Sequence, residues 1–224
     1  MKFSTSILIL GVLVLITFGC KKEEKPPDPI SDIEGNKYKT VRIGTRVLMA
    51  ENLKTTLFND GSEIPLVSNS SDWKDLTTPG YCWYNNDMVA NKDVYGALYN
   101  GFTVTKGKLC PTGWHVPTSD ELQQLLDFSG DTITGGGKLK EAGTSHWLSP
   151  NRGATNSSSF VALPSGIRYF EGSFTAILRY TGYWSSTDTG TNNESILSLY
   201  FGDATVKINQ VSKNYGLSVR RIKD

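Results

Sequence analysis

The last third of the chain consists of short β-prone segments separated by Gly, Asn and Asp, and this pattern restricts the fold more than any other feature. The segments cover residues 159–163, 167–171, 173–180, 182–187, 196–201, 204–210 and 215–222. Strands this short and this closely spaced cannot be joined by the long crossovers that parallel pairing requires. The pattern therefore predicts antiparallel strands.

One helix is clearly predicted upstream of these strands. Thr118 lies three residues before Glu121 in the pattern of a capping box, directly after Pro117, so we expect a helix over residues 119–129. Its apolar face would be formed by Leu122, Leu125, Leu126 and Phe128. A second, short helical turn is predicted at residues 138–141, after three consecutive glycines.

The first part of the domain combines a hairpin with loops. Two β-prone segments, 38–43 and 47–49, flank Gly44 and Thr45, which predicts a β-hairpin. Residues 57–107 are rich in Asn, Asp, Ser, Gly and Pro and predict loops and short elements. No internal repeat and no second linker divides the chain, so we expect a single α+β domain over residues 35–224 with one or two helices.

The N-terminus has the features of an export signal. Lys2 precedes an apolar run over residues 7–18, and Gly19 and Cys20 follow where a cleavage site is expected. The run is shorter than the roughly 20 residues that span a bilayer. The pattern is similar to a bacterial lipoprotein signal, with residues 1–19 removed and acyl chains on Cys20, which would make the membrane a partner. A plain secretory signal with an incidental Cys is the alternative.

Residues 20–34 are predicted to form a flexible tether. The segment after Cys20 is rich in Lys, Glu and Pro, a composition that cannot pack into a core. Its Lys22-Glu23-Glu24 motif resembles the signal that sends lipoproteins of Bacteroidetes-type bacteria to the outer face of the outer membrane. We therefore expect a lipid-anchored protein of the outer membrane that is exposed at the cell surface. A merely soluble spacer is the alternative.

The charge balance argues against nucleic-acid binding. The formal net charge is +1, and one of the lysines, Lys2, belongs to the leader, so the remaining chain is close to neutral. A protein that binds a phosphate backbone needs an excess of Lys and Arg. No nucleic-acid partner is therefore expected.

No motif points to catalysis, to a cofactor or to a metal. The two histidines, His115 and His146, lack the spacing of a zinc site, and the chain has no Gly-x-Ser-x-Gly elbow. The loops at 85–93 and 188–194 carry oxygen side chains suitable for calcium, but neither has EF-hand spacing, and solvated loops are the preferred interpretation. We therefore expect no enzyme, no cofactor and no metal site.

Several short blocks of the sequence resemble one known family. They are NKYKTVRIG (36–44), MAENL (49–53), YGALYN (95–100), CPTGWHVPT (110–118), LPSG (163–166), YWSST (183–187) and SVR (218–220). In this order they are similar to the Fibrobacter succinogenes major paralogous domain, over residues 35–224. The resemblance implies a bacterial surface or secreted protein and a single domain distantly similar to C-type-lectin-like and formylglycine-generating-enzyme folds. It implies no settled activity, and formylglycine generation would need a reactive Cys pair after Cys110, which this chain lacks.

Two cysteines remain if Cys20 is acylated. Cys82 and Cys110 form an even pair in an oxidising compartment, so we expect a disulfide between them. In the alternative, both thiols are buried and free, because the resembled family often has a Cys where this chain has Arg221, which would leave one partner missing.

An aromatic and amide-rich set supplies the candidate binding residues. Aromatic faces and amides suit the apolar face and the hydroxyl edges of a sugar ring. The candidates are Trp147, Asn151, Asn156 and Tyr169. We therefore expect a surface module that binds glycan or another extracellular ligand. The alternatives are that the aromatics belong to the core, and that the protein is a structural or assembly subunit contacting other envelope proteins.

Overall fold

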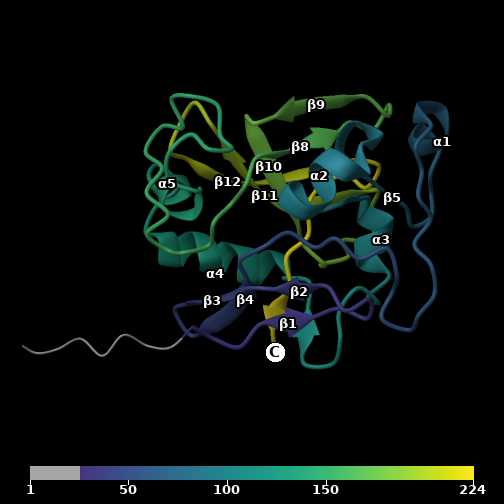
Figure 1. Ribbon diagram of the computed structural model, residues 1–224, viewed down its shortest axis with the longest axis horizontal. Helices are drawn as coiled ribbons and strands as arrows, with labels where there is room; N and C mark the ends of the chain where they lie inside the picture. The colour runs from purple at the N-terminus through teal and green to yellow at the C-terminus, as the bar shows by residue number, and fades with distance from the viewer. Residues whose placement is uncertain (1–25) are drawn as a thin grey trace, which may run out of the picture.

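The first hairpin of the domain pairs with the last strand. In this computed structural model, which describes residues 26–224, strands β3 (Thr40–Ile43) and β4 (Arg46–Met49) form the predicted antiparallel hairpin. Strand β13 (Ile222–Lys223) pairs with β4 on one side and with β7 (Trp114–His115) on the other. The C-terminal strand thus returns to the N-terminal hairpin in one four-stranded sheet (Figure 1).

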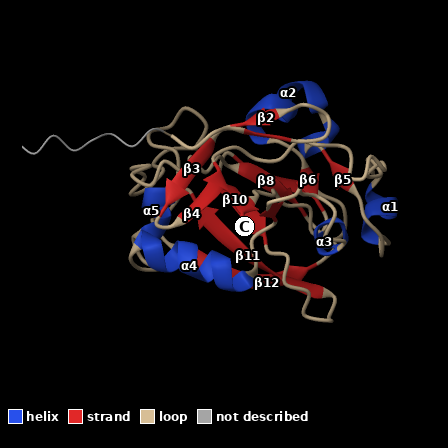
Figure 2. Cartoon of the chain, turned by 90° about the horizontal axis from the view of Figure 1, so that it is seen from below, coloured by secondary structure: helices blue, strands red, loops and turns tan. Residues whose placement is uncertain are grey.

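A second antiparallel sheet is formed by C-terminal strands. Strands β10 (Tyr180–Trp184), β11 (Asn193–Tyr200) and β12 (Val206–Ser212) pair in sequence order. The hairpin of β8 (Ser165–Arg168) and β9 (Phe174–Ile177) lies beside β10 (Figures 1 and 2). The predicted antiparallel pairing is confirmed, whereas a strand at 159–163 was wrong because that segment is irregular apart from one isolated bridge between Ala162 and Lys140.

Helix α4 (Ser119–Ser129) has the predicted bounds and the predicted capping box. Three leucines bury its inner face against β11 and β12: Leu122, Leu125 and Leu126. Phe128 was expected on the same face but is 56% exposed. Each helical residue advances by about 100°, so Phe128 is turned roughly 200° away from Leu126.

The remaining elements are short. Helix α5 (Gly135–Leu139) includes the glycines that were expected to precede a turn. Glycine is required at position 136, because a Cβ there would lie 2.1 Å from the carbonyl oxygen of Thr205. The other elements are β1 (Ile30–Ser31), β2 (Lys37–Tyr38), α1 (Ser70–Lys74), β5 (Tyr81–Cys82), the 3-10 helix η1 (Tyr84–Asn86), α2 (Met88–Tyr95), β6 (Leu98–Tyr99) and α3 (Gly101–Thr105).

The ordered domain begins earlier than the sequence suggested. Residues 30–34 were assigned to the tether, but β1 pairs with β2 and Ile30 is buried in the core. The Thr40 hydroxyl also donates to the carbonyl oxygens of Pro27 and Asp28. The boundary at residue 35 was therefore wrong. Within residues 26–224, no helix has the length and apolarity that crossing a bilayer would require.

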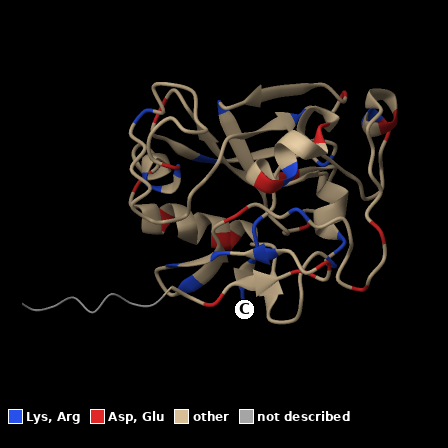
Figure 3. Ribbon diagram, viewed as in Figure 1, with Lys and Arg blue, Asp and Glu red and all other residues tan. Residues whose placement is uncertain are grey.

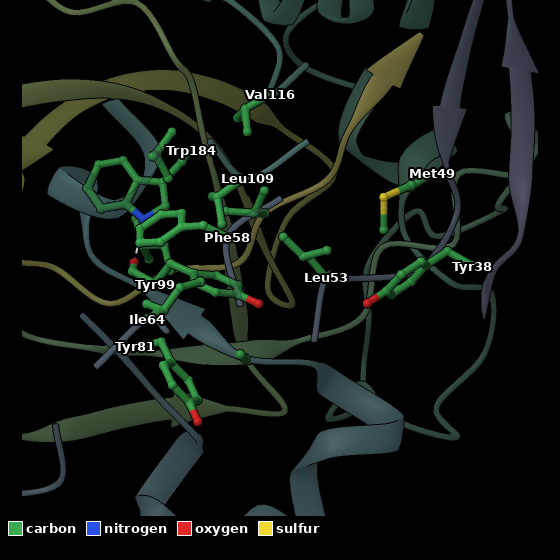
Figure 4. Close-up of a cluster of buried hydrophobic side chains, with 14 of the residues drawn as sticks. Tyr38, Met49, Leu53, Phe58, Ile64, Tyr81, Tyr99, Leu109, Val116 and Trp184 are labelled. Carbon is green, nitrogen blue, oxygen red and sulfur yellow. Dashed lines mark hydrogen bonds between the residues drawn. The ribbon is translucent and has the colours of Figure 1, made fainter. Parts of the chain in front are cut away.

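Two large clusters of buried side chains form the core. The first surrounds Trp184, whose indole N–H donates to the carbonyl oxygen of Tyr99 at 2.7 Å (Figure 4). The second lies between α4 and the sheet of β10–β12 and includes Trp147 and Tyr183. Helices and antiparallel strands pack around these clusters, which confirms the α+β class. The expectation of one or two helices was wrong, because residues 26–224 contain five α-helices, most of them single turns that leave no periodic pattern in the sequence.

A buried cation holds one of the long irregular segments in place. Arg168, fully buried at the end of β8, donates to the carbonyl oxygens of Val67 at 2.5 Å, Ser68 at 3.0 Å and Asn69 at 3.1 Å. Its Nε donates to the carbonyl oxygen of Gly172 at 3.0 Å. The guanidinium also lies over two aromatic rings, those of Trp73 and Phe174. This one side chain therefore joins residues 67–73 to the β8–β9 hairpin.

Replacing Arg168 with Leu should strongly destabilise the protein. The substitution removes four hydrogen bonds and two ring contacts made by one buried side chain, and breaking such a network costs about 3–5 kcal/mol of unfolding free energy. Arg168→Lys keeps the charge but cannot reach four acceptors, so an intermediate loss is expected. Urea denaturation measures both changes. Arg179, which is exposed, provides the matched control, and an Arg168→Leu protein as stable as Arg179→Leu would contradict the assignment.

Candidate ligand-binding site

Two of the predicted binding residues are parts of the core. Trp147 is 1% exposed, and its indole N–H donates to the carbonyl oxygen of Ala162 at 2.9 Å. Asn151 is 4% exposed, and its amide donates to the carbonyl oxygens of Glu141 and Gly143. The expectation that these two side chains contact a ligand from a surface loop was wrong, because both are buried and hydrogen-bonded to backbone carbonyl oxygens of neighbouring loop residues.

The other two predicted residues lie in different parts of the fold. Asn156 is half-buried, and its side-chain oxygen accepts from the backbone N–H of Val161 at 2.9 Å, so it shapes the same loop. Tyr169 lies in the turn between β8 and β9 and packs against the first core cluster, whereas Trp147 belongs to the second. Of the four candidates, Tyr169 is the one with ring neighbours that reach the surface.

Four aromatic side chains gather around that turn: Tyr169, Phe170, Tyr180 and Tyr215. The rings of Tyr169 and Tyr215 meet edge to face at 5.4 Å, and Phe170 is tilted against Tyr215 at 6.0 Å. Tyr169, Tyr180 and Tyr215 rest on the first core cluster, while Phe170 is 49% exposed. We call this group the aromatic platform. It is a partly exposed apolar surface that packs on buried core side chains.

Polar groups border the aromatic platform. The Tyr180 hydroxyl is hydrogen-bonded to Ser198, which also accepts from the exposed Asn209 amide at 2.9 Å. On another side, the Glu171 carboxylate lies near Tyr215. Burial raises the pKa of Tyr180 and of Tyr215, so both hydroxyls stay neutral at physiological pH. The platform therefore combines aromatic faces with neutral and acidic hydrogen-bonding groups.

Sequence reasoning named one member of the aromatic platform and missed three. Phe170 follows Tyr169 in a turn between two β-prone segments, and an aromatic pair in a turn is a usable signal. Tyr180 and Tyr215 carry no such signal, because strand pairing and the return of the chain after β12 bring them to the turn. Their grouping is a consequence of tertiary structure.

The oxygen-rich loops are committed to internal contacts. Asp87 caps α2 by accepting from the N–H of Ala90, and Asn91 donates to the carbonyl oxygens of Tyr84 and Asp87. In the second loop, Lys213 donates to Asp188 at 2.9 Å. Within residues 26–224, no group of three or more His, Cys, Asp or Glu side chains is placed to hold a metal ion.

The cysteines do not form the predicted disulfide. Cys82 on β5 is buried with Trp73 and Leu98, and burial raises the pKa of its thiol to about 12 despite the nearby Arg168 cation. Cys110 packs elsewhere, against the first cluster, with its thiol in contact with Arg221. Burial raises the pKa of that thiol to about 11. Two free thiols match the alternative interpretation, except that Cys110 is only half-buried, and Arg221 is its neighbour.

His115 connects two carboxylates. Its Nδ1 lies 2.5 Å from Asp224, and its Nε2 lies 2.7 Å from Glu121, which also approaches Arg46 at 3.5 Å. Burial favours the neutral imidazole, but the hydrogen bonds to Asp224 and Glu121 outweigh it and raise the pKa of His115. The cluster ties β7 and the chain end after β13 to the first turn of α4, so its role is structural.

Comparison with known proteins identifies one family. The model of the Fibrobacter succinogenes major domain matches residues 41–223, which is most of the chain. No curated protein and no solved structure matches the chain. The predicted lipid attachment site, Cys20, lies outside the described residues.

Stability should decrease with pH where His115 loses its proton. The folded-state pKa of His115 is raised, so its stabilising contribution is complete below about pH 6.5, the unfolded value, and is lost as the pH rises through the folded pKa. Urea denaturation across this range should show the decrease in the wild-type protein and a flatter profile in His115→Gln. Lys140, whose pKa burial lowers to about 8, titrates in both proteins. Identical profiles would show that His115 is not the titrating group.

Proposed function

We propose that this chain, which belongs to the Fibrobacter succinogenes major domain family, is a lipid-anchored binding module at the bacterial cell surface that recognises glycan through its aromatic platform. The observation that carries the proposal is the exposed Phe170 ring on its support of packed tyrosines. A structural or assembly subunit that contacts other envelope proteins is the alternative, and the experiment below separates the two.

The chemistry of the aromatic platform suits a sugar. The C–H face of a pyranose ring stacks on an aromatic face, and its hydroxyl groups need donors and acceptors around the rim. Asn209 supplies an amide and Glu171 a carboxylate near the rings. Because Tyr169 and Tyr215 are fixed by packing, little side-chain entropy would be lost on binding.

The position of the aromatic platform fits a tethered binding module. The β8–β9 turn and the first described residues lie at opposite ends of the long axis of the molecule (Figures 1 and 2). Residues 20–27 can extend to at most roughly 25 Å, about half the reach of the longer tether expected from the sequence. A lipid on Cys20 would therefore hold the domain close to a membrane with the platform directed away from it.

Binding is a better proposal than catalysis for the described residues. The two thiols have raised pKa values, which disfavour the reactive thiolate. His115 is held between Glu121 and Asp224, and His146 is hydrogen-bonded to Glu141. The long loops over short antiparallel strands also support an analogy with C-type-lectin-like folds, which host many binding functions, although such an analogy gives no activity by itself.

Removing the exposed ring should weaken glycan recognition. Phe170→Ala deletes the ring that has the largest free face, and we expect glycan affinity to fall by at least about tenfold, which corresponds to about 1.4 kcal/mol. Glycan-array binding of the protein without its leader, followed by calorimetry on the best ligand, measures the change. Tyr215→Ala should have a similar effect.

Phe128→Ala is the matched control, since Phe128 is 56% exposed but lies on α4 beside Gly44. This variant should bind like the wild type. Absence of binding to any glycan, or equal affinity of the Phe170→Ala and wild-type proteins, would contradict glycan recognition. Protein neighbours crosslinked through the platform in intact cells would then support the assembly role.

Attachment through Cys20 gives a separate test. Acyl chains stabilise membrane binding by about 0.8 kcal/mol per buried CH₂, so several chains make release negligible. Cys20→Ser should move the protein out of the membrane pellet or leave its leader uncleaved. Mass spectrometry of the mature N-terminus checks the chemistry directly, and an unmodified Cys20 or a different mature start would contradict the proposal. Protease treatment of intact cells tests surface exposure.

A further inference from the structure

A cavity distinct from the aromatic platform lies between the N-terminal strands and helix α2. It has a volume of about 340 Å³, within the range of small-ligand pockets. Strand β2 and residues 50–54 form one wall, and the C-terminal half of α2 forms another. The loop that carries Glu141 and His146 closes a third side.

The carboxylates that line this cavity already have partners. Asp93 accepts from the Lys54 ammonium at 2.8 Å, and Glu141 lies 2.9 Å from Nδ1 of His146. The third carboxylate, Glu51, accepts from the backbone N–H of Lys39 at 2.6 Å. The bond to Glu51 comes from a neutral N–H and leaves its charge in place, so the lining carries four ammonium groups beside three carboxylates.

The lysines that line the cavity are mostly unpaired. Of the four, Lys54 has its partner in Asp93, whereas Lys37, Lys39 and Lys92 form no ion pair with any residue of 26–224. Figure 3 shows basic positions on β2 and on α2, which approach the cavity from two sides. Lys92 also helps to lower the pKa of Glu34, but the Glu34 carboxylate is hydrogen-bonded to Thr55 and Thr56.

Positive charges gathered around a cavity raise the local concentration of anions. Apolar groups line the same cavity, including Ala50, Val161 and Leu163, so its walls can also pack against the apolar face of a ring-shaped ligand. Its volume is far larger than a single oxyanion needs. The ligand class that meets all three conditions is a sugar unit that bears an acidic group.

We propose that this cavity is a second binding site, which holds an anionic sugar unit with its carboxylate or sulfate group among Lys37, Lys39 and Lys92. The apolar wall packs against the ring, and the three ammonium groups donate to the oxyanion. This site shares no residue with the aromatic platform, so either proposal can fail without the other.

The test compares charged sugars with a neutral counterpart. Calorimetry at low salt would use a galacturonate trimer for carboxylate, its methyl ester as the uncharged match, a heparin-derived tetrasaccharide for sulfate, and inorganic phosphate alone. We expect at least one charged sugar to bind, with an affinity that falls as salt is added, and we expect the methyl ester and phosphate to bind at least about tenfold more weakly.

Two triple variants locate the site. Lys37→Gln/Lys39→Gln/Lys92→Gln should weaken binding of the charged sugar by at least about tenfold. Lys74→Gln/Lys138→Gln/Lys223→Gln removes the same charge from other parts of the surface and should bind within about twofold of wild type. Both should keep the wild-type unfolding midpoint, and NMR should show the ring signals of His146 shifting when the sugar is added.

Four results would overturn the proposal. One is that neither charged sugar binds to the wild-type protein. Another is that the two triple variants weaken binding equally, which would indicate nonspecific attraction by net charge. The third is that phosphate binds as tightly as the charged sugars, which would show that the ring is not recognised. Loss of binding in Phe170→Ala but not in the cavity variant would assign the anionic sugar to the aromatic platform.

Discussion

Buried cations that bind backbone carbonyl oxygens hold the irregular parts of this fold together. A loop cannot satisfy its carbonyl groups through a strand ladder, and leaving them unpaired in the interior is costly. Arg168 satisfies four such groups, and the buried Lys140 ammonium donates to three more, on Arg152, Tyr200 and Asp203. Arg220 reaches those of Phe160 and Val161. Long loops thereby become parts of a rigid domain.

The aromatic platform depends on the same kind of interaction between a buried cation and backbone carbonyl oxygens. Tyr169 and Phe170 directly follow Arg168, and the carbonyl oxygen of Gly172 accepts from its Nε, so the guanidinium fixes both sides of their turn. Gly172 has φ +93, and a Cβ there would lie 2.6 Å from the backbone of Ser70. The close approach of α1 to this turn thus requires glycine. Aromatic side chains on an otherwise free turn would be mobile, whereas here they stand on an anchored backbone.

Local signals in the sequence were reliable, and long-range ones were not. The capping box at Thr118 and the turn residues between β3 and β4 encode structure within a few residues, and both elements formed as predicted. Trp147 was misassigned because its burial depends on Ala162, 15 residues along the chain, and on a core cluster that includes the leucines of α4, and no local pattern around Trp147 indicates either contact. The bonds of Arg168 span about a hundred residues, and an isolated Arg in a β-prone segment carries no sign of them.

The same contrast separates structural charges from candidate binding charges. Arg168, Arg220 and Lys140 are buried, and their side chains donate hydrogen bonds to backbone carbonyl oxygens of the fold. Lys37 and Lys39 lie at the surface, line a cavity and have no ion-pair partner within residues 26–224. Unpaired lysines grouped around a cavity add nothing to the stability of the fold through ion pairing. The proposed anionic ligand would supply the negative charge that these lysines lack.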